Sequence, residues 1–119
     1  MPIVSLLTNL PQQFTTEFRK SFLEVLSKTL KKAPELIGIH LVSDKNCTLG
    51  VTDEPAVILN VKAVGFLSAE ENIEHAKVIS DFVESSLGVP SRRTLIHFEN
   101  LQPNEVAIAG TTVAAARGK

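Results

Sequence analysis

TEFRKSFLEVLSKTLKK, residues 16–32, is the stretch that decides the fold. Its apolar side chains recur with helical spacing between charged ones, which predicts an amphipathic helix with one buried face. Two apolar stretches flank it, residues 2–7 (PIVSLL) and residues 36–42 (LIGIHLV), and both are typical of buried strands. The chain therefore begins with a strand, a helix and a return strand.

The second half of the chain repeats this order. Residues 56–64 (AVILNVKAV) predict a strand, and SAEE at residues 68–71 is a capping box that starts a second amphipathic helix. Residues 94–98 (TLIHF) predict a fourth strand, and the apolar segment at residues 106–108 is a candidate fifth. Two βαβ units predict an α+β, two-layer fold in a single domain, residues 1–119, with a four-stranded mixed sheet and both helices on one face.

With both helices on one face, the other face of the sheet is uncovered. The predicted strands are almost continuously apolar, so that face would expose apolar side chains to water. Closed cyclic symmetry is the simplest way for identical chains to cover such a face. The sequence therefore predicts a homo-oligomer in which several sheets pack around a central axis.

Composition and charge argue against several classes of partner. The formal net charge is -1, and this balance does not favour binding to nucleic acid or to an anionic membrane. The first residues lack the pattern of a signal peptide, so none is expected, and no apolar run is long enough to span a membrane. The single cysteine, Cys47, cannot form an internal disulfide, so a cytoplasmic location is expected. Any extracellular role would need secretion without a signal peptide.

Motifs for nucleotides, metals and thiol chemistry are missing from the sequence. It contains no GxGxxG, P-loop, HExxH or CxxC pattern, so no cofactor is expected. His40, His75 and His97 are far apart in the sequence and do not predict a metal site. His75 falls on the polar side of the second predicted helix and is interpreted as a solvated surface residue.

Pro2 is the candidate catalytic residue that remains. It follows Met1 directly at the start of a buried strand, and a small second residue permits removal of Met1. That removal would leave a secondary amine at the end of the chain. A proline that merely starts a strand is the structural alternative.

Further short motifs along the chain support a functional role for Pro2, because their order and spacing match those of a known family. They are Leu7-Thr8-Asn9-Leu10-Pro11, Lys32-Ala33-Pro34, Asp53-Glu54-Pro55-Ala56, Ala63-Val64-Gly65 and Arg93-Thr94-Leu95-Ile96. Together they resemble the macrophage migration inhibitory factor family over nearly the whole chain. Within it, the chain looks closer to D-dopachrome tautomerase, through Asn9-Leu10-Pro11, Leu95-Ile96 and Gly110-Thr111-Thr112-Val113. The resemblance implies a cofactor-independent keto–enol tautomerase, built as a homotrimer with each active site at a subunit boundary.

By position, the resemblance assigns roles to five residues. Pro2 matches the catalytic base, Lys32 the cation that binds the substrate carboxylate, and Val64 a residue whose backbone lines the pocket. Leu95 and His97 match pocket positions that the neighbouring subunit supplies. Burial and the charge of Lys32 would both lower the pKa of the Pro2 amine, as a base at neutral pH requires. The implied substrates are phenylpyruvate-like keto acids or dopachrome-like compounds.

Departures from the family pattern affect the pocket. The founding member carries Tyr at the position of Leu95 and Asn at that of His97, so the pocket here would be less aromatic and differently polar. Lys32 has an alternative role as an ordinary cation at a helix C-terminus. The founding member is a cytokine, which implies an alternative function for the whole chain. It would then be a secreted, cytokine-like binding protein for a cell-surface receptor, with weak or vestigial tautomerase activity.

Overall fold

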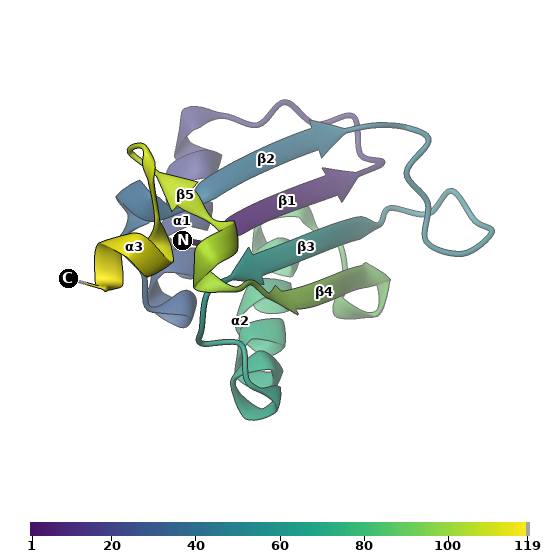
Figure 1. The fold of residues 1–119 in the computed structure, drawn as a ribbon. Helices are drawn as coiled ribbons and strands as arrows, with labels where there is room; N and C mark the ends of the chain where they lie inside the picture. Colours follow the sequence, from purple (N-terminus) through teal and green to yellow (C-terminus); the bar gives the residue numbers. More distant parts are fainter. Residues whose placement is uncertain (119) are drawn as a thin grey trace.

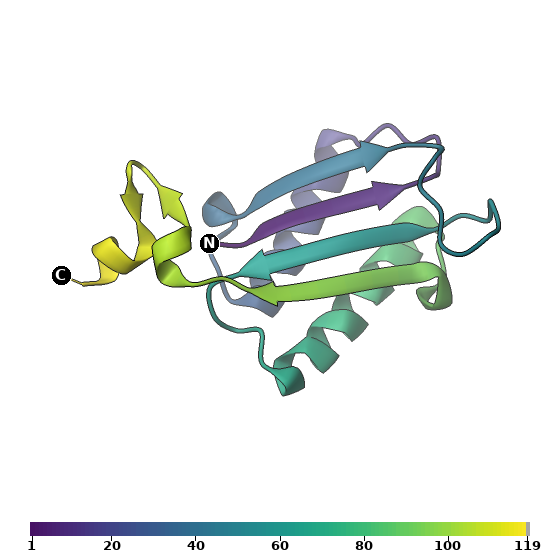
Figure 2. The same cartoon turned by 45° about the vertical axis from the view of Figure 1, so that its right-hand side comes forward.

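The computed structural model describes residues 1–118, and Figures 1 and 2 show them from two directions. The strands are β1 (Ile3–Thr8), β2 (Gly38–Ser43), β3 (Val57–Ala63), β4 (Thr94–Asn100), β5 (Ala107–Ile108) and β6 (Thr111–Thr112). The helices are α1 (Thr16–Leu30), α2 (Ala69–Leu87) and the short α3 (Val113–Arg117). Within this described part of the chain, every helix is too short or too polar to cross a membrane.

The main sheet contains four strands in the order β2-β1-β3-β4. β1 is parallel to β2 and antiparallel to β3, and β3 is parallel to β4, so the sheet is mixed. Both α1 and α2 lie behind the sheet in Figure 2, as two right-handed βαβ units require. The predicted α+β fold, with a four-stranded mixed sheet and two helices on one face, is confirmed.

The core lies between the two long helices and the sheet. Alternate residues of β1 and β3 face it, because the side chains of a strand point to opposite faces in turn. Between the helices, the ring centre of Phe82 lies 5.5 Å from those of Phe18 and Phe22. The largest fully buried apolar side chains are Phe22, Leu6, Leu26, Leu30, Leu59, Ile79, Val4, Val57, Val61, Val83 and Val89. The core is therefore mainly aliphatic.

The capping box of α2 forms as predicted. The Glu71 N–H donates to the Ser68 hydroxyl at 3.1 Å, and the Ser68 N–H donates to the Glu71 carboxylate at 3.1 Å. α1 ends at Leu30, slightly before its predicted end, because Lys31 adopts a left-handed conformation with a φ of 58°. This reversal directs the chain out of the helix and back toward the sheet.

The structure differs from the sequence-based boundaries in two further places. The strand predicted from residue 36 starts at Gly38, because Pro34–Leu36 form a 3₁₀ turn. The candidate strand at residues 106–108 is β5, and it pairs with β6 in a small hairpin separate from the main sheet. β6 and α3 have no counterpart in the sequence-based prediction. In Figure 2 this C-terminal segment projects past the end of the sheet where the N-terminus lies.

The face of the sheet opposite the helices is only partly apolar. An apolar row crosses the four strands in register and consists of Val42, Leu7, Ile58 and Leu95. A polar row lies beside it and consists of His40, Ser5, Asn60 and His97. The prediction that the strands are almost continuously apolar is therefore wrong for this second row.

Arg93 holds the long loop between β2 and β3 by hydrogen bonds to its backbone. Its nearly buried guanidinium donates to the backbone carbonyls of Leu49 (2.9 Å), Glu54 (2.9 Å) and Pro55 (3.3 Å). The neighbouring Arg92 is exposed and reaches only the Glu54 carboxylate, at 3.8 Å. The two adjacent arginines therefore offer a matched comparison.

We predict that Arg93→Met lowers the free energy of unfolding by about 1–3 kcal/mol, because three backbone carbonyls lose a nearly buried donor. Arg92→Met removes the same charge from the surface and should change that free energy by less than about 0.5 kcal/mol. Urea denaturation of both variants measures the difference. Equal stability of the two variants would show that Arg93 does not hold the loop.

Candidate functional site

The N-terminus lies between the end of the main sheet and the C-terminal segment (Figure 1). Pro2 is buried directly before β1, and its carbonyl accepts a hydrogen bond of 3.0 Å from the Gly38 N–H. Met1 is partly buried and packs against a small apolar cluster that includes Val64 and Val113. The first residues are therefore held as part of the sheet and its surroundings.

A cavity of about 290 Å³ opens beside the N-terminus. It is lined by Met1, Lys32, Leu36, Ile108, Thr111, Thr112, Val113, Ala116 and Arg117. The lining is mostly apolar and contains two cations, which suits a small organic anion with an apolar body. Among residues 1–118, no group of three His, Cys, Asp or Glu side chains is placed to hold a metal ion.

Lys32 is held in place just beyond the end of α1. Its N–H donates to the Ser27 carbonyl at 3.2 Å, and the Ser27 hydroxyl donates to the Lys32 carbonyl at 2.5 Å. The Lys32 ammonium lies 4.9 Å from the centre of the Phe66 ring, within the range of a cation–π contact. Both the backbone and the ammonium of Lys32 are thus positioned at the cavity.

The loop between β3 and α2, which carries Phe66, is tightly built. Gly65 and Phe66 have φ angles of 82° and 63°. A positive φ is strained for phenylalanine, so surrounding contacts must support it. The next carbonyl, that of Leu67, accepts from the side-chain amides of Asn72 at 3.3 Å and Asn100 at 3.1 Å. The loop is therefore a defined support for the Phe66 ring.

The pKa of the N-terminal amine lies below its ordinary value. Burial is the largest cause, and the charges of Lys32 and then of Arg117 add to it. All three disfavour the protonated amine, which is partly desolvated and is repelled by two cations. The amine is therefore shifted toward its neutral form, which is the form that accepts a proton.

The structure places three of the five predicted site residues near the N-terminus, but only Lys32 lines the cavity. Pro2 lies next to Met1 in the chain, and Val64, only 4% exposed, belongs to the apolar cluster against which Met1 packs, and neither of them lines the cavity. Leu95 and His97 lie on β4, on the open face of the sheet, and do not line the cavity. Any contribution from these two residues to such a cavity therefore requires a neighbouring copy of the chain.

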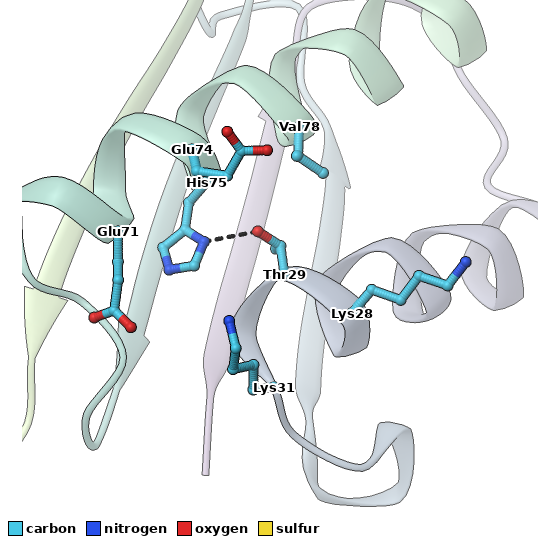
Figure 3. Close-up of a pocket in the computed structure, with 7 residues that line it drawn as sticks. All are labelled: Lys28, Thr29, Lys31, Glu71, Glu74, His75 and Val78. Atoms are coloured by element: carbon cyan, nitrogen blue, oxygen red, sulfur yellow. Dashed lines mark hydrogen bonds between the residues drawn. The ribbon is translucent and has the colours of Figure 1, made fainter.

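The interpretation of His75 as a solvated surface residue is wrong, because His75 is only 3% exposed. Figure 3 shows its ring directed from α2 toward α1, at a second cavity of about 340 Å³, where Nδ1 lies 2.7 Å from the Thr29 hydroxyl. Its Nε2 lies 2.6 Å from the Phe66 carbonyl, and its ring centre lies 6.0 Å from that of Phe98. Helical periodicity assigns histidine to the polar face, but here the contacts of both nitrogens make burial favourable.

The sequence pattern also does not predict that the C-terminal segment lines the cavity beside the N-terminus. Arg117 and Ile108 both line the cavity beside the N-terminus. Local signals exist, since Gly110 makes the hairpin turn with a φ of 82°, and the Thr112 hydroxyl caps α3 by accepting from the Ala115 N–H at 3.0 Å. β5, β6 and α3 are so short that a periodic pattern of apolar residues cannot reveal them.

Comparison with known proteins adds independent findings. The chain matches the family model of macrophage migration inhibitory factor (MIF) over residues 1–114. It is 32% identical to the MIF-like protein mif-2 of Caenorhabditis elegans, over 100% of both chains. It is 28% identical to the macrophage migration inhibitory factor homolog of Trichinella spiralis, over 94% of this chain and 99% of that one.

Solved structures share the fold. The structure of macrophage migration inhibitory factor from Trichinella spiralis aligns with a TM-score of 0.86 at 27% identity, covering 92% of this chain and 98% of that one. The homologue from Prochlorococcus marinus aligns with a TM-score of 0.84 at 20% identity, covering 93% of this chain and 98% of that one. At 20% identity, the second comparison supports the fold alone.

We predict that Lys32→Gln and Arg117→Gln each raise the pKa of the N-terminal amine, because each removes a cation that destabilises the protonated form. Lys45→Gln is the control, since Lys45 follows the end of β2, which is parallel to β1 and therefore ends at the side of the sheet opposite to the N-terminus. NMR titration of the isotope-labelled terminus measures the three values. A fall in the pKa, or an equal rise in the Lys45 variant, would contradict the prediction.

Proposed function

This chain belongs to the macrophage migration inhibitory factor family, and we propose that it is a cofactor-independent keto–enol tautomerase with Pro2 as the catalytic base. One observation carries the proposal. A buried proline follows Met1 beside an apolar cavity, where burial, and then the charges of Lys32 and Arg117, lower the pKa of the terminal amine. The proposal requires removal of Met1, because only then does Pro2 carry a basic nitrogen.

Tautomerisation of a keto acid needs only a group that moves a proton. The Pro2 nitrogen takes a proton from the carbon next to the ketone, and the electrons of that C–H bond form the carbon–carbon double bond of the enolate. The same nitrogen then returns the proton to the oxygen, which completes the enol. Nothing is oxidised or reduced, so a positioned base is sufficient.

Two features support Pro2 as a base near neutral pH. Pro2 is buried with Met1 in place, and the burial that remains after removal of Met1 would lower the pKa of the Pro2 amine, because burial disfavours the charged form. Lys32 and Arg117 lower the pKa of the Met1 amine, one residue away, and would act in the same direction on a Pro2 terminus. The neutral amine is then available to take the substrate proton.

Lys32 is proposed to bind the substrate carboxylate. Its side chain lines the cavity, and among the residues that the structure describes it forms no ion pair that would compete. An ammonium group beside the substrate also stabilises the negative charge that develops on the enolate oxygen. Val64 would supply backbone and apolar surface behind the reacting group.

The proposed substrates are phenylpyruvate-like keto acids or dopachrome-like compounds. Both join a carboxylate to a flat unsaturated body, which suits a cavity with cations and an apolar lining. Asn9-Leu10-Pro11 and Leu95-Ile96 support the D-dopachrome tautomerase branch as part of this proposal. The relatives compared above carry MIF names, so the branch rests on these residues and on Gly110-Thr111-Thr112-Val113 alone.

A homotrimer, which is typical of the family, would complete the site. Leu95 is 49% exposed and belongs to the apolar row on the open face of the sheet, which a neighbouring sheet can cover. His97 lies beside it in the polar row, with Nδ1 3.0 Å from Oδ1 of Asn60. We propose that Leu95 and His97 line the pocket of a neighbouring subunit.

We predict that Pro2→Gly lowers kcat/KM for phenylpyruvate tautomerisation by about 10²-fold or more, the scale of general base catalysis. Glycine also permits removal of Met1, so the variant keeps a terminal amine but loses the ring that holds the nitrogen in place. Pro11→Gly, in an exposed part of the chain, is the control and should keep the wild-type rate. Intact mass must establish the loss of Met1 in every preparation.

The same variant separates the enzyme from a second candidate function, a cytokine-like ligand of a cell-surface receptor. The names of the relatives favour this candidate. Saturable cell binding that survives Pro2→Gly, together with an inactive processed wild type, would favour the ligand over the enzyme. An unchanged rate in Pro2→Gly would overturn the role of Pro2 as the base.

We also predict that subunits complement one another. Pro2→Gly and the double variant Leu95→Ala/His97→Ala should both be poorly active alone, because each damages one side of every shared site. Co-refolding of the two should restore part of the activity, since some boundaries in mixed trimers pair an intact Pro2 with an intact Leu95 and His97. A particle mass of one 12.9 kDa chain, or no recovery on mixing, would contradict shared sites.

A further inference from the structure

His75 forms hydrogen bonds on both sides of its ring. It projects from α2 toward α1, where Nδ1 meets the Thr29 hydroxyl at 2.7 Å (Figure 3). On the other side, Nε2 lies 2.6 Å from the carbonyl of Phe66. His75 therefore bridges a helix and the loop between β3 and α2, which are far apart in the sequence.

The two partners determine which nitrogen carries the proton. A backbone carbonyl only accepts hydrogen bonds, so Nε2 must donate to Phe66. In the neutral ring, Nδ1 then accepts from the Thr29 hydroxyl. The ring is only 3% exposed, although His75 and Thr29 both line the second cavity. A ring nitrogen that loses its partner would therefore be poorly hydrated.

Phe66 connects this bridge to the proposed active site. Its backbone has a φ of 63°, which phenylalanine adopts only with support, and its carbonyl is the one that His75 binds. Its side chain is 41% exposed, so core packing does not fix the ring. The same ring lies 4.9 Å from Nζ of Lys32. The backbone of Phe66 thus places the ring, and the ring contacts the ammonium of Lys32, a residue that lines the cavity.

We propose that His75 is a positioning residue of the tautomerase site, which holds the Phe66 carbonyl and thereby sets the place of the Lys32 ammonium. This inference rests on the proposed function, because it takes Lys32 as the group that binds the substrate carboxylate. His75 does not line the cavity beside the N-terminus, so its effect reaches that cavity through Phe66.

A second anchor of the loop makes this role testable in a folded protein. The side chains of Asn72 and Asn100 both donate to the Leu67 carbonyl, next to the peptide that His75 holds. These bonds do not involve His75. Loss of the His75 contact should therefore release the Phe66 peptide locally and leave the rest of the loop attached.

Substitutions at position 75 can separate the two hydrogen bonds. His75→Gln places an amide donor near the position of Nε2 and retains the bond to Phe66. His75→Asn places its amide near the position of Nδ1 and retains only the bond to Thr29, and His75→Phe loses both bonds. Lys77→Gln, at an exposed position of α2, is the matched control.

We expect KM for phenylpyruvate to rise by about two- to fivefold in His75→Asn and His75→Phe, the scale of one exposed cation–π contact, with a smaller change in kcat. In His75→Gln and Lys77→Gln, KM should stay within about twofold of the wild-type value. The pKa of the terminal amine should rise in the Asn and Phe variants, because the Lys32 charge is no longer held beside it. NMR titration of the processed protein measures this pKa without any substrate.

Two results would overturn the proposal. If KM and the amine pKa keep their wild-type values in His75→Asn and His75→Phe while only the melting temperature falls, His75 is a purely structural residue. If His75→Gln and His75→Asn give equal KM values, the hydrogen bond from His75 to the Phe66 carbonyl does not determine substrate binding. An inactive wild type would instead refute the proposed function, and the amine pKa alone would then decide whether His75 positions Lys32.

Discussion

The central position of β1 in the sheet is the constraint on which the rest of the structure depends. β1 starts at Ile3 and pairs with β2 on one side and with β3 on the other. The ends of most domains are poorly ordered, but here the first residues are held by two neighbouring strands. Pro2, Lys32 and Val64 meet because the start of β1, the exit from α1 and the end of β3 all reach the same end of the sheet.

The main sheet and its two helices could be predicted because their sequence signals are local and strong. Residues 16–32 repeat apolar positions with helical spacing over several turns, and the capping box at Ser68 marks the start of α2 without reference to the rest of the fold. The open face was harder to predict. Polar residues such as Ser5 and Asn60 occur singly between apolar neighbours, and only strand pairing reveals that they form one row.

The candidate site was predictable only in part. From the sequence pattern alone, Pro2 is a proline that starts a strand and Lys32 is a cation at the end of a helix. Only the resemblance to a family predicted that the two belong to one site. His75 is buried because its ring bonds to the Thr29 hydroxyl and to the Phe66 carbonyl. Only the tertiary structure brings these partners to it, so the local sequence pattern could not predict the burial. The firmest predictions therefore concern residues whose neighbours in sequence are also their neighbours in space.

The pairing of β1 also sets an order of events during synthesis. β1 leaves the ribosome first, whereas β2 and β3 follow much later in the chain. At about 5–20 residues per second, the terminus stays unpaired for on the order of seconds. Once the sheet has closed, Met1 packs against the cluster that includes Val64 and Val113. Removal of Met1, which the proposed function requires, would therefore compete least with packing while the chain is still unfolded.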